Sequence, residues 1–171
     1  MDTKERRRAL LQKLKIADKP VTGTELAREL RVSRQIIVGD IAILRAAGEA
    51  VYATPQGYIL PAAEKTGALT ATLACRHGRD ALAKELTIMI DNGGKVLDVV
   101  VEHPVYGEIR ANLMLSSRRD IADFLHNLSG SGAEPLSIVT GGVHLHTLEL
   151  PDRKALRQIE QELRQEGILV N

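Results

Sequence analysis

The sequence has few aromatic residues and almost no cysteine. Three tyrosines, one phenylalanine and no tryptophan occur among its 171 residues. Proteins that bind single-stranded nucleic acids usually stack the bases on aromatic rings, so the composition argues against that class of function. Cys75 is the one cysteine, which excludes an intrachain disulfide. Neither a secretory signal nor a long apolar segment is present, so we expect a cytoplasmic protein.

A large net charge is also absent, but the charge is unevenly distributed. Residues 1–62 carry 11 Lys and Arg and 7 Asp and Glu, whereas residues 63–171 carry 12 and 15. A basic N-terminal part attached to an acidic remainder indicates a segment that faces a polyanion, joined to a domain of a different kind. The length suits one large domain or two small ones.

Residues 1–61 have the pattern of a winged helix-turn-helix domain. After a first amphipathic helix, Thr22 and Glu25 form a capping box that begins a second helix. Ser33 caps a third helix, which Gly48 ends. The following stretch, EAVYATPQGYILP, predicts a hairpin with its turn at residues 54–57. Two helices, a tight turn, a capped third helix and a hairpin together predict a DNA-binding winged helix.

The third helix is the one that enters the major groove in such domains, with its N-terminal residues leading. Arginine can bind guanine edges and glutamine adenine edges. We therefore expect DNA contacts from five residues: Ser33, Arg34, Gln35, Val38 and, to phosphates, Arg45. The N-terminal run Arg6 to Arg8 is also placed for phosphates. One alternative stays open, because winged helices sometimes bind proteins and leave this helix solvated.

The remaining residues predict a second domain, at 68–171, after a linker at 62–67. Strand-like and helix-like segments alternate in the order β-α-β-β-α-β, followed by a closing helix. This order predicts a two-layer α+β fold with a mostly antiparallel sheet and helices on one face. The segments 134–139 and 143–150 flank a Thr-Gly-Gly signal, which predicts a hairpin between two strands.

Two histidines lie two residues apart in the stretch GGVHLHTLEL, residues 141–150. Side chains alternate between the faces of a strand, so His144 and His146 project from the same face. Two imidazoles so arranged can present ring nitrogens to one point, which is a recurrent beginning of a metal site. Leu148 and Leu150 share that face, but the opposite face is also partly apolar, and periodicity leaves open which of the two is buried.

Two more candidate ligands lie near the first strand of the second domain. His77 ends that strand, and Glu85 lies about two turns along the following helix. The helical neighbours of Glu85 are apolar, and a carboxylate on an inner helix face requires a partner. Three imidazoles and one carboxylate suit zinc, nickel or iron better than magnesium or calcium. We therefore expect one divalent transition metal ion with four ligands: His77, Glu85, His144 and His146.

Other groups near this site admit more than one interpretation. His103, in the segment EHPVYGE, is an effector-binding group, a group that supports a metal ligand, or a simple turn residue. Cys75 lies two residues before His77 and can act as a soft ligand, but a small buried apolar residue is the better interpretation. The histidines themselves can also be structural, as isolated histidines usually are.

Nearly the whole chain, from about residue 4 to 168, resembles the niacin-responsive transcriptional repressors of the NiaR/YrxA type. The N-terminal segment PVTGTELARELRVSRQIIVGDIAILRAAG is similar to their winged helix, although many repressors share that feature. The landmarks RHGRDALAKEL, VEHPVYGEI and GGVHLHTLEL resemble their three-histidine (3H) domain and are far more specific. The resemblance implies an HPr-like fold for this domain and a divalent metal ion at the same four residues.

The resemblance further implies a repressor of genes for NAD synthesis and niacin uptake, with nicotinic acid as corepressor. We expect a homodimer that binds a palindromic operator in double-stranded DNA, because two-fold DNA sites call for two-fold proteins. Two rivals remain at this point. The cation itself can be the signal, or the chain can be a metal-dependent enzyme with a DNA-binding head. Against an enzyme, the sequence offers no convincing general base, nucleophile elbow or phosphate loop.

Overall fold

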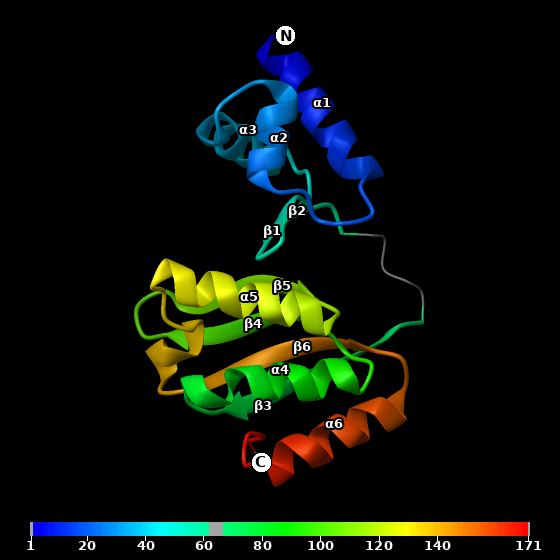
Figure 1. Cartoon of the computed structure of the whole chain (residues 1–171), viewed down its shortest axis with the longest axis vertical. Helices are drawn as coiled ribbons and strands as arrows, with labels where there is room; N and C mark the ends of the chain where they lie inside the picture. Colours follow the sequence, from blue (N-terminus) through cyan, green and yellow to red (C-terminus); the bar gives the residue numbers. More distant parts are fainter. Residues whose placement is uncertain (1, 62–66, 171) are drawn as a thin grey trace. The chain divides into compact units, whose positions relative to one another are not determined.

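The chain folds into two compact units, residues 1–65 and 66–171, in a computed structural model that describes residues 2–61 and 67–170 (Figure 1). Each unit has its own buried core and is described by itself. The expected linker at 62–67 lies outside the described residues except for Gly67. The domain boundaries therefore stay a prediction. None of the described helices is long and apolar enough to cross a membrane.

The N-terminal unit consists of three helices and a two-stranded antiparallel sheet, as the sequence predicts. Its elements are α1 (Thr3–Ile16), α2 (Gly23–Leu30), α3 (Arg34–Ala46), β1 (Tyr52–Thr54) and β2 (Gly57–Ile59). The Thr22 hydroxyl accepts the Glu25 N–H and the Glu25 carboxylate accepts the Thr22 N–H, which completes the predicted capping box. The Ser33 hydroxyl caps α3 by accepting the Ile36 N–H at 3.3 Å.

The helices of this unit pack through the apolar stripes that the sequence indicates. The most buried side chains come from all three helices: Leu10, Leu14, Leu26, Ile37 and Ile41. The hairpin is attached to the segment before α2, because Val21 and Tyr58 exchange both backbone hydrogen bonds. Gly57 makes this attachment possible. Its φ is +134°, and a Cβ atom there would lie 2.5 Å from the Val21 carbonyl oxygen.

The C-terminal unit is a four-stranded antiparallel sheet with helices on one face. Its elements are β3 (Leu69–Arg76), η1 (Arg79–Ala81), α4 (Leu82–Asp91), β4 (Lys95–His103), β5 (Gly107–Leu115), α5 (Arg118–Ser131), η2 (Leu136–Thr140), β6 (Val143–Leu150) and α6 (Arg153–Gln165). The strand order is β3-β6-β4-β5. Helix α4 contacts both α5 and α6, and Figure 1 shows α4 and α5 side by side across the sheet. The predicted two-layer β-α-β-β-α-β fold with a closing helix is confirmed.

One sequence expectation about this unit is wrong. The segment expected as a strand at 134–139 instead contains η2, a short 3-10 helix. Pro135 lacks an N–H and cannot join a strand ladder in full. The Ile138 N–H donates to the Pro135 carbonyl, and the Gly142 N–H donates to the Ser137 carbonyl at 2.9 Å. The segment therefore closes on itself and packs against β4 and β6 rather than pairing as a hairpin.

The face of β6 that bears the two histidines is the buried one. His144, His146, Leu148 and Leu150 are each at most 3% exposed, whereas Val143 and Leu145 on the opposite face are exposed. Pairing with β3 places Cys75 opposite His144. This face packs against α4, so side chains of β3, β6 and α4 meet between the two layers.

Candidate metal centre

Glu85 lies at the centre of the three histidines that the sequence singles out. Its carboxylate is fully buried on the inner face of α4. Its Oε2 atom lies 2.6 Å from Nε2 of His77 and 3.4 Å from Nε2 of His146. Its Oε1 atom lies 2.9 Å from Nε2 of His144. The structure thus brings together all four residues predicted as metal ligands, from the end of β3, from α4 and from β6.

The other ring nitrogen of each histidine is bound to a backbone carbonyl oxygen. Nδ1 of His77 donates to Gly78 at 2.6 Å, Nδ1 of His144 to Gly142 at 2.8 Å, and Nδ1 of His146 to Asp98 at 2.6 Å. A carbonyl oxygen can only accept, so each Nδ1 carries the proton. In the neutral imidazole the Nε2 atom is then an acceptor, with its lone pair toward Glu85.

Three lone pairs and a carboxylate that face one another need positive charge between them. Burial alone raises the pKa of a carboxyl group, but the imidazoles of His144, His146 and His77, which donate to the carboxylate when Nε2 is also protonated, outweigh burial and hold the pKa of Glu85 well below its usual range. Glu85 is therefore ionised. Charge balance is reached either by protonating the imidazoles or by binding a cation among the four acceptors.

The donor set fits a divalent transition metal ion. Imidazole nitrogens and a carboxylate oxygen are the ligands that zinc and its neighbours prefer, and metal-bound histidines commonly donate their second N–H to a carbonyl, as all three do here. Ligands about 2.1 Å from a tetrahedral ion lie roughly 3.4 Å apart. The Glu85 oxygens lie 2.6–3.4 Å from the three Nε2 atoms, at or below that spacing.

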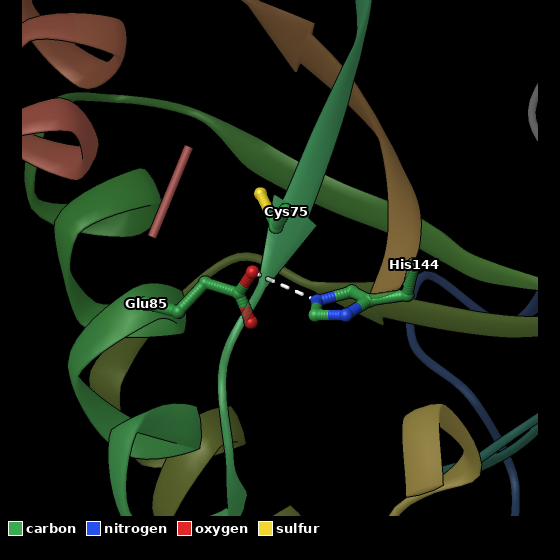
Figure 2. Close-up of side chains that lie close together, drawn as sticks. All are labelled: Cys75, Glu85 and His144. Atoms are coloured by element: carbon green, nitrogen blue, oxygen red, sulfur yellow. Dashed lines mark hydrogen bonds and ion pairs between the residues drawn. The ribbon is translucent and has the colours of Figure 1, made fainter. Parts of the chain in front are cut away.

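Cys75 is a neighbour of this cluster that the sequence left as a minor candidate. The ligand atoms of Cys75, Glu85 and His144 all lie within 4.8 Å of one another. Figure 2 shows the Cys75 thiol on β3 beside the Glu85 carboxylate. That carboxylate projects from α4 toward the His144 ring. Burial, together with the charge and hydrogen bond of Glu85, raises the pKa of the Cys75 thiol. Three imidazoles and the carboxylate supply four ligands without the thiol, and Cys75 stays a neighbouring alternative ligand.

Two residues that sequence reasoning missed hold the histidines in place. Gly142 has a φ of +97°, and a Cβ atom there would lie 2.4 Å from the His77 carbonyl oxygen. Asp98 lies where β4 shifts register, and its carbonyl accepts the His146 Nδ1–H. The Asp98 carboxylate accepts the Thr147 N–H at 2.9 Å and pairs with Arg110. The Gly-Gly pair was a visible signal, whereas no sequence pattern predicts the register shift.

An apolar cavity lies beside the cluster. It has a volume of about 230 Å³, and His144 and His146 form part of its wall. Most of its lining is aliphatic or aromatic and comes from α4, α5 and the sheet, including Leu82, Val99 and Phe124. A second cavity of about 140 Å³ adjoins His77. An apolar cavity with a few convergent polar groups is the usual form of a small-molecule site.

His103 is the last residue of β4, at the start of the turn that leads to β5. Its Nδ1 accepts the N–H groups of Val105 and Tyr106 at 3.0 and 3.2 Å, and its ring packs on the Tyr106 ring. Among the described contacts, none joins His103 to Glu85. The geometry favours the turn interpretation, and a role in effector binding stays a prediction.

The predicted DNA-contacting residues lie on α3 and its N-cap. Ser33, Arg34 and Gln35 are exposed, and Val38 is half-buried. Arg45 is exposed, although its Nε donates to the Val51 carbonyl oxygen at 2.7 Å.

Arg6 and Arg7, which we expected to face phosphates, both bind a buried carboxylate within the unit. Asp40 is 3% exposed, and its oxygens lie 2.6 Å from Nε of Arg6 and 3.6 Å from Nη1 of Arg7. This ion pair joins α1 to α3, so these two side chains contribute to positioning the helix that we expect to contact DNA.

Comparison with known proteins agrees with the division of the chain into an N-terminal and a C-terminal unit. A family model described as "HTH domain" matches residues 6–59, and one described as "3H domain" matches residues 70–171. The fold and the histidine cluster thus define a helix-turn-helix protein with a 3H domain. The chain is 43% identical to a probable transcription repressor NiaR of Thermotoga maritima, over 97% of this chain and 94% of the relative. It is 41% identical to the transcription repressor NadR of Bacillus subtilis, over 96% and 93%.

These relatives cover nearly the whole chain, so the chain belongs to the NiaR-type family of transcription repressors. The predicted family is thereby confirmed. Both of these similar proteins are named as transcription repressors, and neither name describes an enzyme.

Proposed function

We propose that this chain represses genes of NAD synthesis and niacin uptake in the cytoplasm, with nicotinic acid as corepressor. The observation that carries the proposal is the apolar cavity beside three convergent imidazoles and a buried carboxylate. A flat pyridine ring suits the apolar walls. The family to which the chain belongs supports the DNA-binding half of the proposal.

In this proposal the four residues of the cluster hold one zinc, nickel or iron ion. His77, His144 and His146 offer Nε2 atoms whose orientation is fixed by the carbonyl groups on Nδ1, and Glu85 supplies the negative charge. When bound, the ion supplies an electron-pair acceptor at the end of the cavity. The protein residues arrange the ligands, exclude water from them and shape the space for the ring.

In the N-terminal unit we propose that α3 contacts the major groove. Ser33, Arg34, Gln35 and Val38 lie at the helix end that leads into the groove in such domains, and Arg45 lies nearer the phosphates. A homodimer would present two such helices to a palindromic operator, with half-sites about 10 base pairs apart or a multiple of that. Nicotinate acts as a corepressor only if it binds the DNA-binding conformation more tightly than the conformation that does not bind DNA. A ligand with equal affinity for both conformations does not shift the equilibrium between them.

The test uses an operator selected from a random duplex library by the full chain. Its affinity is measured by fluorescence anisotropy at fixed salt, with and without nicotinate, on protein loaded with metal. We expect nicotinate to strengthen operator binding, and nicotinamide to do so far less. Unchanged affinity across a nicotinate titration would refute the corepressor role while leaving the DNA-binding role intact.

A second candidate is a repressor for which the cation is the signal. The same cluster favours it, because a buried set of four acceptors changes its charge balance when the ion is removed. Operator affinity measured against buffered free metal, at saturating nicotinate, separates the two. A steep response within a narrow metal range supports sensing, whereas a retained ion and a flat response support a structural or ligand-binding role.

A further inference from the structure

An exposed ion pair lies at the edge of the proposed effector cavity. Nη1 of Arg79, in η1, is 2.9 Å from Oε2 of Glu134, which precedes Pro135. Glu134 forms part of the wall of the 230 Å³ cavity that includes His144 and His146. Arg79 forms part of the wall of the adjoining cavity that includes His77. Leu82, Pro135 and Ser137 belong to both walls, so the ion pair joins the walls of two adjacent cavities.

Little free energy is lost when the ion pair between Arg79 and Glu134 is broken and Arg79 binds another carboxylate. Arg79 is 48% exposed and Glu134 is 60% exposed, and ion pairs this open to water contribute little to the stability of a fold. A guanidinium group binds carboxylates through a planar fork of N–H donors and does not discriminate a side chain from a ligand. A carboxylate that enters the cavity can therefore replace Glu134 on Arg79 without leaving the guanidinium unpaired.

We propose that Arg79 binds the carboxylate of the effector and that Glu134 is the group it releases. The proposal rests on the proposed function, in which a pyridine carboxylate enters this cavity. The ring then lies against the apolar wall, with its carboxylate at the mouth rather than in the apolar interior. Arg79 is thus the residue that selects an anionic pyridine carboxylate over the corresponding neutral amide. Glu134 competes with the ligand for the same guanidinium and sets how tightly it binds.

The two partners of the pair should therefore act in opposite directions. Arg79→Gln removes the group that binds the carboxylate, whereas Glu134→Gln removes the competitor. A pair with a purely structural role behaves differently, because either substitution breaks the same bond and moves every property in the same direction. The sign of the two effects separates a ligand-exchange role from a structural one.

The experiment is isothermal titration of the full, zinc-loaded chain with nicotinate and with nicotinamide. We expect Arg79→Gln to weaken nicotinate binding at least tenfold and to leave nicotinamide binding unchanged, so that selectivity for the acid is lost. We expect Glu134→Gln to tighten nicotinate binding about two- to fivefold. Arg79→Lys keeps the charge without the fork and should lie between wild type and Arg79→Gln. Thermal midpoints and zinc content show that the variants are folded and loaded.

A matched control is the exposed ion pair between Arg118 and Asp91 in the same unit, at 2.5 Å. Arg118→Gln breaks a similar pair at other residues and should leave nicotinate binding unchanged. The proposal is overturned if the Arg79 and Glu134 variants shift nicotinate affinity in the same direction, or leave it unchanged. It is also overturned if Arg118→Gln has the effect of Arg79→Gln. Failure of the wild-type chain to bind nicotinate refutes the proposed function itself.

Discussion

Replacing Gly39 with alanine should stabilise the fold while weakening DNA binding. Gly39 lies in the middle of α3, is exposed, and has no atom within 4 Å of the position of an added Cβ. It follows Gln35 by one turn, on the face opposite the buried Ile37 and Ile41. A glycine in a helix interior costs about 0.5–1 kcal/mol relative to alanine, and nothing within the unit explains that cost. Close approach of DNA does explain it.

The magnitude follows from the size of the unit. A stabilisation of about 0.5–1 kcal/mol in a unit of about 60 residues raises the melting temperature by roughly 2–8 °C. If α3 enters the groove as proposed, the added methyl group would lie between the helix and the DNA. We expect operator affinity to fall about tenfold, or about 1.4 kcal/mol. The assays are thermal unfolding by circular dichroism and anisotropy titration with the operator and with unrelated duplex.

Gly130 provides the matched control. It lies within α5 of the other unit and also has no atom within 4 Å of an added Cβ. Gly130→Ala should therefore stabilise its own unit and leave operator affinity unchanged. The reasoning is refuted if Gly39→Ala binds the operator as tightly as wild type. In that case α3 does not approach DNA closely at this position.

Three further predictions concern the metal centre. Zinc at 100 times its Kd should stabilise the wild-type chain against thermal unfolding by about 2.7 kcal/mol. Glu85→Gln should abolish this stabilisation by zinc. Equal stabilisation of the variant and the wild type would contradict a role for Glu85 in binding the metal. Asp98→Ala removes the carboxylate beside the carbonyl that orients His146, and metal competition assays should show affinity about 10–100-fold weaker. Burial favours the neutral form of His77, but the hydrogen bond and charge of Glu85 outweigh it and raise the pKa of His77. Protons therefore compete with metal from a pH above the ordinary histidine value of about 6.5. Affinity measured from pH 8 to 5 should fall steadily, and a flat profile would contradict histidine ligation.

The sequence predicts the N-terminal unit almost completely because local signals specify it. Thr22, Glu25 and Ser33 cap helices through contacts within one turn, and the turn before Gly57 closes a short hairpin. Such interactions depend on neighbouring residues alone. The ion pair of Arg6 with Asp40 is different, because it joins residues 34 positions apart and needs the packed helices to exist.

In the C-terminal unit the sequence predicts which four side chains meet but not how the imidazole rings are oriented. His144 and His146 share a strand face by alternation, and an apolar helix face at Glu85 indicates an unpaired buried charge. The carbonyl groups that fix the rings come from Gly142 and from the register shift at Asp98, which arise from sheet packing. The segment around Pro135 was misjudged because a proline and a Gly-Gly turn suit a hairpin as well as a 3-10 helix.

The most direct test of the central claim is anomalous diffraction from crystals of the full chain, recorded above and below the absorption edge of the bound metal. The account predicts one peak per chain, about 2.0–2.2 Å from Nε2 of His77, His144 and His146 and from a Glu85 oxygen. The contradicting result is the absence of any peak at these four residues, with the imidazoles bound to Glu85 alone as protonated partners.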